Sequence, residues 1–113
     1  MFMDFNEYQK KSRKHAFYPN QNTPESFRYL IYGVTGEAGE LAEHFKHALR
    51  DENDEISSER RDKIIKELSD ILWYLANICT ELGVDFNQIP KTGLEKIEER
   101  VKRGTLSGEG DSR

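Results

Sequence analysis

Four acidic side chains near the middle of the chain are the residues best suited to chemistry. Glu37 and Glu40 form one pair, and Glu67 and Asp70 form a second pair with the same spacing of three residues. On a helix, residues three apart lie on the same face. Gathered carboxylates are costly unless a cation lies among them, and oxygen-only ligands suit Mg²⁺, with Mn²⁺ as a substitute. The spacing therefore predicts a metal site formed by these four residues and, because Mg²⁺ commonly bridges to substrate phosphates, phosphate chemistry.

Two long apolar heptad segments must position these carboxylates. Their apolar residues recur at steps of four and three, the pattern of a helix with one hydrophobic seam. These residues are Phe27, Ile31, Val34, Ala38, Leu41, Phe45 and Ala48 in the first segment, and Ile64, Leu68, Ile71, Leu75, Ile78 and Leu82 in the second. Each acidic residue comes one position before a seam residue, so all four carboxylates flank the seam in one helical phase. Because Glu40 and Glu67 lie at similar distances from the intervening turn, antiparallel packing would bring both pairs to one height.

Capping and turn residues predict four helices and no strand. The expected ranges are 4–14, about 23–49, about 57–83 and about 85–103, opened by Asp4, by Thr23-Pro24, by Ser57 or Ser58, and by Asp85, with Pro90 able to delay the last start. Gly83 and Gly104 are expected to end the last two helices. The fold class is therefore all-α: a helical bundle built on a long antiparallel helix hairpin plus short N- and C-terminal helices. Residues 1–103 form a single domain, and 104–113 form a Gly/Ser-rich tail.

The composition narrows the class of protein. Of the 113 residues, 35% are hydrophobic and 34% charged, a lean supply for a monomeric core, so we expect oligomerisation into a homodimer or homotetramer. A net charge of −4 without a basic stripe argues against a nucleic-acid partner. No signal peptide or membrane-spanning stretch is evident, so we expect a cytoplasmic protein without a membrane partner. The single Cys79 lies among apolar positions, which favours a buried small side chain over a reactive thiol.

Further polar and small residues share the carboxylate face of the two segments. Tyr74 and Asn77 follow Asp70 by one and two turns, where they could bind a ligand, order a carboxylate or simply pack on the helix face. His44 could ligate a metal beside Glu40, although surface or otherwise hydrogen-bonded histidines are commoner. Three glycines inside the first long helix allow close approach of a neighbouring helix or, less readily, of a ligand. They are Gly33, Gly36 and Gly39.

Both acidic motifs resemble those of a known enzyme family. Glu37-Ala-Gly-Glu40 and Glu67-Leu-Ser-Asp70 resemble the paired ExxE and ExxD motifs of the MazG-like nucleoside triphosphate pyrophosphohydrolases. The wider stretches 36–43 and 67–76, Tyr8-Gln9 and the end of the chain are similar to that family's small single-domain members. The resemblance therefore covers nearly the whole chain.

The resemblance implies an all-α, Mg²⁺-dependent hydrolase that cleaves an NTP or dNTP between the α and β phosphates. Its products would be a nucleoside monophosphate and pyrophosphate. Carried over by position, the four acidic residues would hold the metal, and a carboxylate-oriented water would attack the α-phosphorus. Which carboxylate acts as general base, and how many ions bind, stay open.

The resemblance also implies substrate contacts outside the acidic motifs. Tyr74 matches a ligand-contacting tyrosine, and Lys96 and Arg100 match basic residues of the last helix that meet the triphosphate. Gly93 stands where family members often carry an asparagine, so one phosphate or ribose contact has no counterpart here. Base and sugar specificity and the physiological role are not determined by these residues.

Two other functions remain open at this point. Heptads alone predict association, so a non-enzymatic helical interaction or regulatory module is an alternative. A carboxylate-bridged di-metal redox bundle would also place acids on facing helices, but it normally needs Glu-x-x-His in two helices. Neither acidic motif has histidine three residues on.

Overall fold

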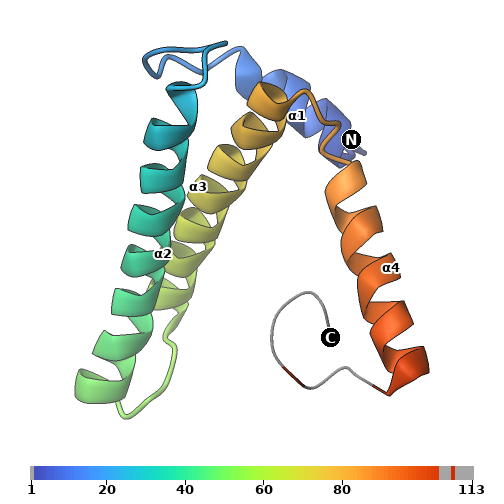
Figure 1. Ribbon diagram of the computed structural model, residues 1–113. Coiled ribbons are helices and arrows are strands. Elements are labelled where there is room, and N and C mark those ends of the chain that lie inside the picture. The colour runs from blue at the N-terminus through green and yellow to red at the C-terminus, as the bar shows by residue number, and fades with distance from the viewer. Residues whose placement is uncertain (1, 105–107, 109–113) are drawn as a thin grey trace.

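Two long antiparallel helices, α2 and α3, form a hairpin that dominates the molecule (Figure 1). The computed structural model describes residues 2–104 and Gly108. The helices are α1 (Phe5–Arg13), α2 (Ser26–Asp51), α3 (Ser58–Leu82) and α4 (Gln88–Arg103), and the described residues include no strand. The predicted all-α fold is confirmed. The predicted tail lies almost wholly outside the described residues.

Local capping explains where α1 and α3 begin and where α3 and α4 end. Asp4 Oδ1 accepts from the Glu7 backbone N–H at 2.8 Å, and Ser57 Oγ accepts from that of Arg60 at 3.1 Å. Gly83 and Gly104 end α3 and α4 with φ of 72° and 71°, the left-handed region that glycine enters without a Cβ penalty. These predicted caps are confirmed.

The N-cap positions of α2 and α4 are Glu25 and Asn87, two residues later than the predicted Thr23 and Asp85. The Thr23 hydroxyl donates to the Asn20 carbonyl at 2.7 Å, and the Ser26 N–H donates to the Thr23 carbonyl at 3.1 Å. Thr23 therefore belongs to a turn that precedes α2, and its side chain does not cap the helix. The Asp85 carbonyl similarly accepts from the Gln88 N–H in a turn, and α4 then carries Pro90 in its first turn, where the missing N–H costs little.

The heptad seam of the hairpin is split into a buried column and an exposed column. The first column contains Ala48, which is fully buried, and Ile64, which is 9% exposed, and its other members are half-buried. The other column is spaced by seven residues on each helix and remains half exposed. It comprises Ile31 (50%) and Phe45 (49%) with Ala38 between them, and Leu68 (49%), Leu75 (37%) and Leu82 (60%). Within one chain, the hairpin thus uses only half of its seam.

α1 packs across α3, whereas α4 stands apart. Gln9 of α1 donates to Thr80 Oγ1 at 3.2 Å and to the Val84 carbonyl at 2.9 Å, and accepts from the Phe86 N–H at 2.9 Å. The Phe86 ring stacks on Phe5 with centroids 4.8 Å apart. Within the described part of the chain, α4 contacts no other helix (Figure 1).

Cys79 is 4% exposed, as predicted for a packed small side chain.

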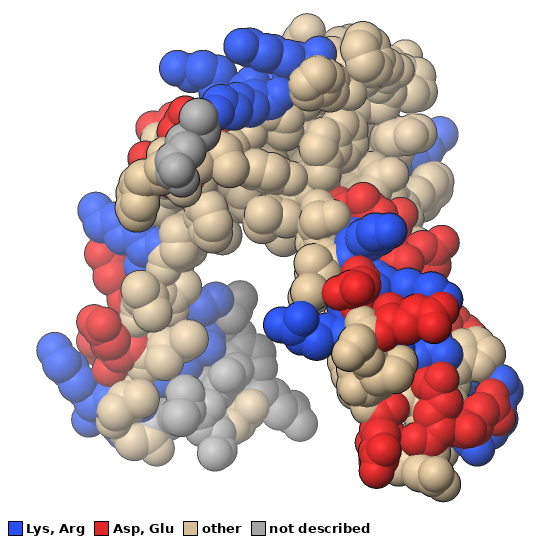
Figure 2. Space-filling model, turned by 180° about the vertical axis from the view of Figure 1, so that it is seen from behind, with Lys and Arg blue, Asp and Glu red and all other residues tan. Residues whose placement is uncertain are grey.

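The two ends of the hairpin differ in surface charge. Figure 2 shows acidic and basic side chains gathered on the half of the hairpin nearer the α2–α3 turn, while mainly uncharged residues cover the half nearer α1. No helix in the described residues is both long and apolar enough to cross a membrane.

Candidate functional site

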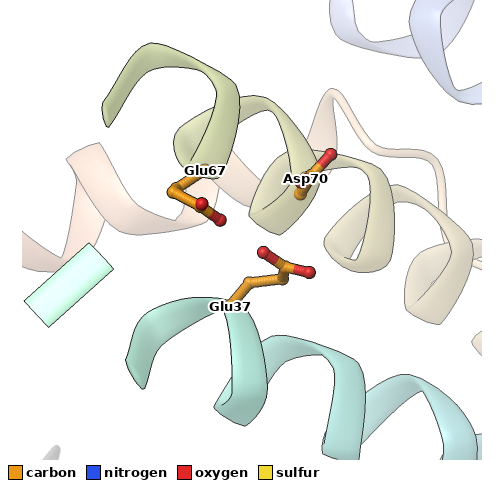
Figure 3. Close-up of side chains that lie close together, drawn as sticks. All are labelled: Glu37, Glu67 and Asp70. Atoms are coloured by element: carbon orange, nitrogen blue, oxygen red, sulfur yellow. The ribbon is translucent and has the colours of Figure 1, made fainter. Parts of the chain in front are cut away.

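Three of the four predicted metal ligands meet across the hairpin. Glu37 of α2 and Glu67 and Asp70 of α3 each offer an oxygen, and these oxygens lie within 4.8 Å of one another. Figure 3 shows the Glu37 carboxylate directed toward the two side chains of α3. Glu40 lies outside this group and lines a neighbouring hollow together with Glu67 and His44. Because the two acidic pairs share one helical phase, residues from both pairs meet in one carboxylate cluster between α2 and α3.

Two carboxylate oxygens of the cluster have no donor from another side chain in the described structure. Glu37 Oε2 and Glu67 Oε2 are buried and have no hydrogen-bond partner in the described structure. A buried acceptor left in this way costs free energy, and a buried anion costs more. A divalent cation would supply the missing partner, and a set of carboxylate oxygens is the donor set that Mg²⁺ and Mn²⁺ prefer. The residues present therefore fit such an ion.

The same crowding perturbs the acidity of the cluster. A hydrogen bond shared with Glu67, burial, and the charges of Glu40 and Asp70 raise the pKa of Glu37 to about 7. The pKa of Glu67 is lowered, first by the hydrogen bond that it accepts from Glu37 and also by His44. In the metal-free protein the pair thus shares one proton near neutrality, and a bound cation would replace that proton.

The Tyr74 ring packs into the space left by Gly33, one helical turn from Glu37 and Asp70. A Cβ at Gly33 would lie 2.2 Å from Tyr74 Cε1, so the ring occupies space that any other residue would fill. Burial and the neighbouring Tyr29 raise the pKa of the Tyr74 phenol, with Glu37 and Asp70 contributing. The phenol therefore stays neutral. The close approach predicted for the helix glycines is confirmed here.

The other two helix glycines behave differently. A Cβ at Gly36 or Gly39 would meet nothing within 4 Å in the described chain. The close approach expected at all three glycines therefore occurs at one of them within this chain.

The structure does not bring Asn77, Lys96 and Arg100 to the cluster within one chain. Asn77 is fully buried, its Nδ2 donates to the Trp73 carbonyl at 3.0 Å, and its Oδ1 accepts from Arg13 at 3.5 Å. Its amide therefore serves the contact between α1 and α3. Lys96 and Arg100 lie on α4, which makes no contact with α2 or α3 in the described residues.

Glu81 organises a second polar centre that the sequence did not single out. Its carboxylate accepts from the Tyr18 hydroxyl, from Ser26 Oγ and the Asn22 N–H at 2.9 Å each, and pairs with Arg13 at 3.0 Å. Burial opposes its ionisation, but these hydrogen bonds outweigh burial and lower the pKa of Glu81. The signal in the sequence is an acid within an apolar stretch of helix, which does not reveal donors 55 or more residues away, before α2 and at its first residue.

Comparison with known proteins supplies an independent observation. The family model of the MazG nucleotide pyrophosphohydrolase domain matches residues 25–105, a range that includes all four acidic residues. The Gene 37 protein of Mycobacterium phage L5 is 36% identical over 109 residues, which cover 94% of this chain and 96% of the phage protein. No solved structure matches the chain significantly.

Proposed function

The chain belongs to the MazG nucleotide pyrophosphohydrolase family, and we propose that it hydrolyses a nucleoside or deoxynucleoside triphosphate between the α and β phosphates. The products are a nucleoside monophosphate and pyrophosphate, and the metal ion is Mg²⁺, which Mn²⁺ can replace. The observation that carries the proposal is the convergence of Glu37, Glu67 and Asp70, two of which present a buried oxygen without a donor.

The chain's own residues divide the work at this site. Glu37, Glu67 and Asp70 hold the ion, with Glu40 beside them as the fourth ligand or as a group that orients water. When bound, the ion neutralises phosphate charge and lowers the pKa of a bound water. Without the ion, the crowded carboxylates repel a bare triphosphate, so substrate binding depends on the metal.

Tyr74 is the substrate-binding residue best placed within one chain. Burial, Tyr29 and the charges of Glu37 and Asp70 raise the pKa of its phenol, which therefore keeps its proton and can donate a hydrogen bond to a phosphate oxygen. Asn77 is not included in this proposal because its amide is buried against α1.

We propose in addition that the working form is a homodimer or a larger homo-oligomer. The exposed column repeats every seven residues on both helices of the hairpin, so a second copy can cover it around a two-fold axis as a four-helix bundle. The apolar face of α4 is also exposed in the described chain, where Leu94, Ile97 and Val101 are 61%, 48% and 59% exposed. Docking of α4 on such an assembly would bring Lys96 to the phosphates, whereas Arg100 is 5% exposed in this chain and would reach them only by leaving its present surroundings.

The proposed activity is tested with a panel of NTPs and dNTPs incubated with Mg²⁺. Pyrophosphate is read as inorganic phosphate after addition of pyrophosphatase. We expect turnover of at least one nucleotide, its loss with EDTA, and its return with Mg²⁺ or Mn²⁺. No turnover of any nucleotide would contradict the proposal and favour a non-catalytic interaction module, while copurifying iron would favour a redox bundle. Sedimentation equilibrium measures the oligomeric state, and a monomer would refute the assembly alone.

A further inference from the structure

A chain of contacts leads from the α2–α3 turn to the carboxylate cluster. Arg60 donates twice to Glu52, which closes α2: Nε lies 2.9 Å from Oε1 and Nη2 lies 3.3 Å from Oε2. The remaining nitrogen, Nη1, lies 3.1 Å from His44 Nδ1. On the other edge of the ring, His44 Nε2 lies 3.4 Å from Glu67 Oε1. The side chains of His44 and Glu67 are only 17% and 16% exposed, so water shields this contact poorly.

Arg60 decides which nitrogen of His44 carries the proton. A guanidinium has only donors and stays protonated, so His44 Nδ1 must accept from it. The ring proton then resides on Nε2, and Nε2–H donates to Glu67 Oε1. With one nitrogen accepting and the other protonated, His44 has no lone pair left for a metal. It therefore lies beside the cluster and is not one of its ligands.

The two oxygens of Glu67 consequently differ. Oε1 accepts from His44, whereas Oε2 is buried without a donor, as is Oε2 of Glu37. A carboxylate held through one oxygen presents the other in a fixed direction, which is how outer hydrogen bonds orient metal ligands. We propose that His44 is a positioning residue that aims Glu67 Oε2 at the metal ion, and that Arg60 enables this by holding the His44 proton on Nε2. The proposal rests on the metal site of the proposed function.

The same helix supplies a matched control. His47 lies three residues after His44, and its ring is 40% exposed. It lies 3.5 Å from Glu43 and 2.8 Å from Arg50, both on α2, and no contact joins it to Glu67 in the described structure. A variant of His47 removes an imidazole from α2 and leaves the Arg60–His44–Glu67 chain intact.

The tautomer is measured without metal or substrate. Long-range ¹H–¹⁵N spectra of the histidine-labelled, metal-free protein, recorded above the titration range of imidazole, distinguish the two neutral forms. We expect Nε2–H for His44, and a mixture of tautomers in Arg60→Met. A proton on Nδ1 in the wild type would overturn the proposal, and so would an unchanged tautomer in Arg60→Met.

Metal affinity tests the consequence of the tautomer. Calorimetric titration with Mn²⁺ should show His44→Ala binding about 10–100-fold more weakly, the usual effect of losing an outer partner of a ligand. His44→Gln places an amide N–H near the former Nε2 and should stay within about threefold of the wild type. His47→Ala should bind as the wild type does. Equal affinity of His44→Ala and the wild type, or equal loss in His47→Ala, would contradict the proposal.

The outcomes separate this proposal from the enzymatic one. A protein that binds Mn²⁺ with the stated dependence on His44 but hydrolyses no nucleotide refutes the proposed function and supports this inference. A protein that hydrolyses a nucleotide while His44→Ala retains full Mn²⁺ affinity refutes the inference alone. A wild type that binds no divalent cation refutes both. If His44→Ala does not fold, the wild-type tautomer and His44→Gln still decide the matter.

Discussion

Glu81 and Glu67 are both glutamates of α3 with shielded carboxylates, yet hydrogen-bond donors surround the first carboxylate and other carboxylates face the second. The side chain of Glu81 is 2% exposed, and hydroxyl, backbone and guanidinium donors surround it. The side chain of Glu67 is 16% exposed, and it faces Glu37 and Asp70 with one oxygen left without a donor. A buried carboxylate that donors satisfy belongs to the scaffold, whereas one that meets other carboxylates needs a cation.

Glu67→Gln tests the catalytic half of this contrast, and its effect should be the largest. The substitution keeps the shape of the side chain and removes the charge that a cation needs. We expect the rate of pyrophosphate release to fall by more than the about 100-fold that loss of an outer partner costs. The melting temperature, followed by circular dichroism, should stay equal or rise, because repulsion within the cluster decreases.

A glutamate of α2 outside the cluster provides the control for that loss. Glu43 is exposed and pairs with Lys46 at 2.9 Å, so Glu43→Gln should retain the wild-type rate. A fully active Glu67→Gln would overturn the metal-site assignment. Equal losses in both variants would show that negative charge near the site matters only in a general way.

Glu81→Gln tests the scaffold half and should act on stability. Glu81 Oε1 accepts from the Asn22 N–H and from Ser26 Oγ, and Oε2 accepts from Tyr18 and pairs with Arg13. An amide nitrogen at either place opposes donors, and the neutral amide leaves Arg13 without its anionic partner. Breaking a buried pair of this kind, with partial exposure of the partner, should lower the free energy of unfolding in urea by about 2–4 kcal/mol.

The folded fraction of Glu81→Gln keeps the carboxylate cluster intact. Its Mn²⁺ affinity, measured under conditions where the variant is folded, should equal that of the wild type. Unchanged stability would remove the distinction between a satisfied and an unsatisfied carboxylate on which the contrast rests.

Local spacing was enough to predict the hairpin and the cluster, because both depend on helical phase. The i, i+3 acids and the heptads place Glu37, Glu67 and Asp70 on facing sides before any tertiary contact is known. The contact between Arg60 and His44 could not be predicted in this way, because it crosses the α2–α3 turn, whose geometry the spacing does not encode. The partners of Glu81 could not be predicted either, because they come from the end of α1, the following loop and the start of α2.

Helical phase shows on which face of a helix a residue lies, but it does not show which neighbouring helix covers that face. Tyr74 and Asn77 share one stripe, but residues three apart differ by about 60° around the helix. That difference sends Tyr74 toward α2 at Gly33 and buries Asn77 against Arg13 of α1. The position of α4 likewise cannot be predicted from its own periodicity, which shows that the helix has an apolar face but not what that face packs against.

The pH dependence of metal binding sharpens the contrast through Glu37. Its pKa rises from an ordinary value of 4.5 to about 7, so between these values the folded protein holds a proton that the unfolded chain has released. This contribution to stability is present below pH 4.5 and is lost as the pH rises through 7. Because a cation must displace that proton, Mg²⁺ affinity should increase about tenfold per pH unit below 7 and level off above it.

Calorimetry in two buffers of different ionisation enthalpy measures the proton released with each ion. His44→Gln should retain the slope, which separates Glu37 from the adjacent imidazole. An affinity that is flat between pH 5.5 and 7.5 would show that the cluster holds no proton to displace.

The smallest effect concerns two tyrosines that repeat the same contrast. Tyr18 donates to the satisfied Glu81, whereas the Tyr74 ring fills the space at Gly33, one helical turn from the unsatisfied Glu37. Gly33→Ala forces the Tyr74 ring off α2, and relief of such an overlap costs about 1–3 kcal/mol against a helix gain of about 0.5–1 kcal/mol. We expect a several-fold rise in the KM for nucleotide, a small loss of stability in urea, and unchanged Mn²⁺ affinity.

Gly36→Ala is the matched control, because a Cβ there meets nothing within 4 Å in the described chain and should simply stabilise the helix. The double variant Gly33→Ala/Tyr74→Ala removes the overlap, so alanine at position 33 should then be neutral or stabilising relative to Tyr74→Ala alone. A cost of Gly33→Ala that is the same with and without the ring would mean that Gly33 acts on something other than Tyr74. The glycine would then belong to the scaffold and have no part in positioning the site.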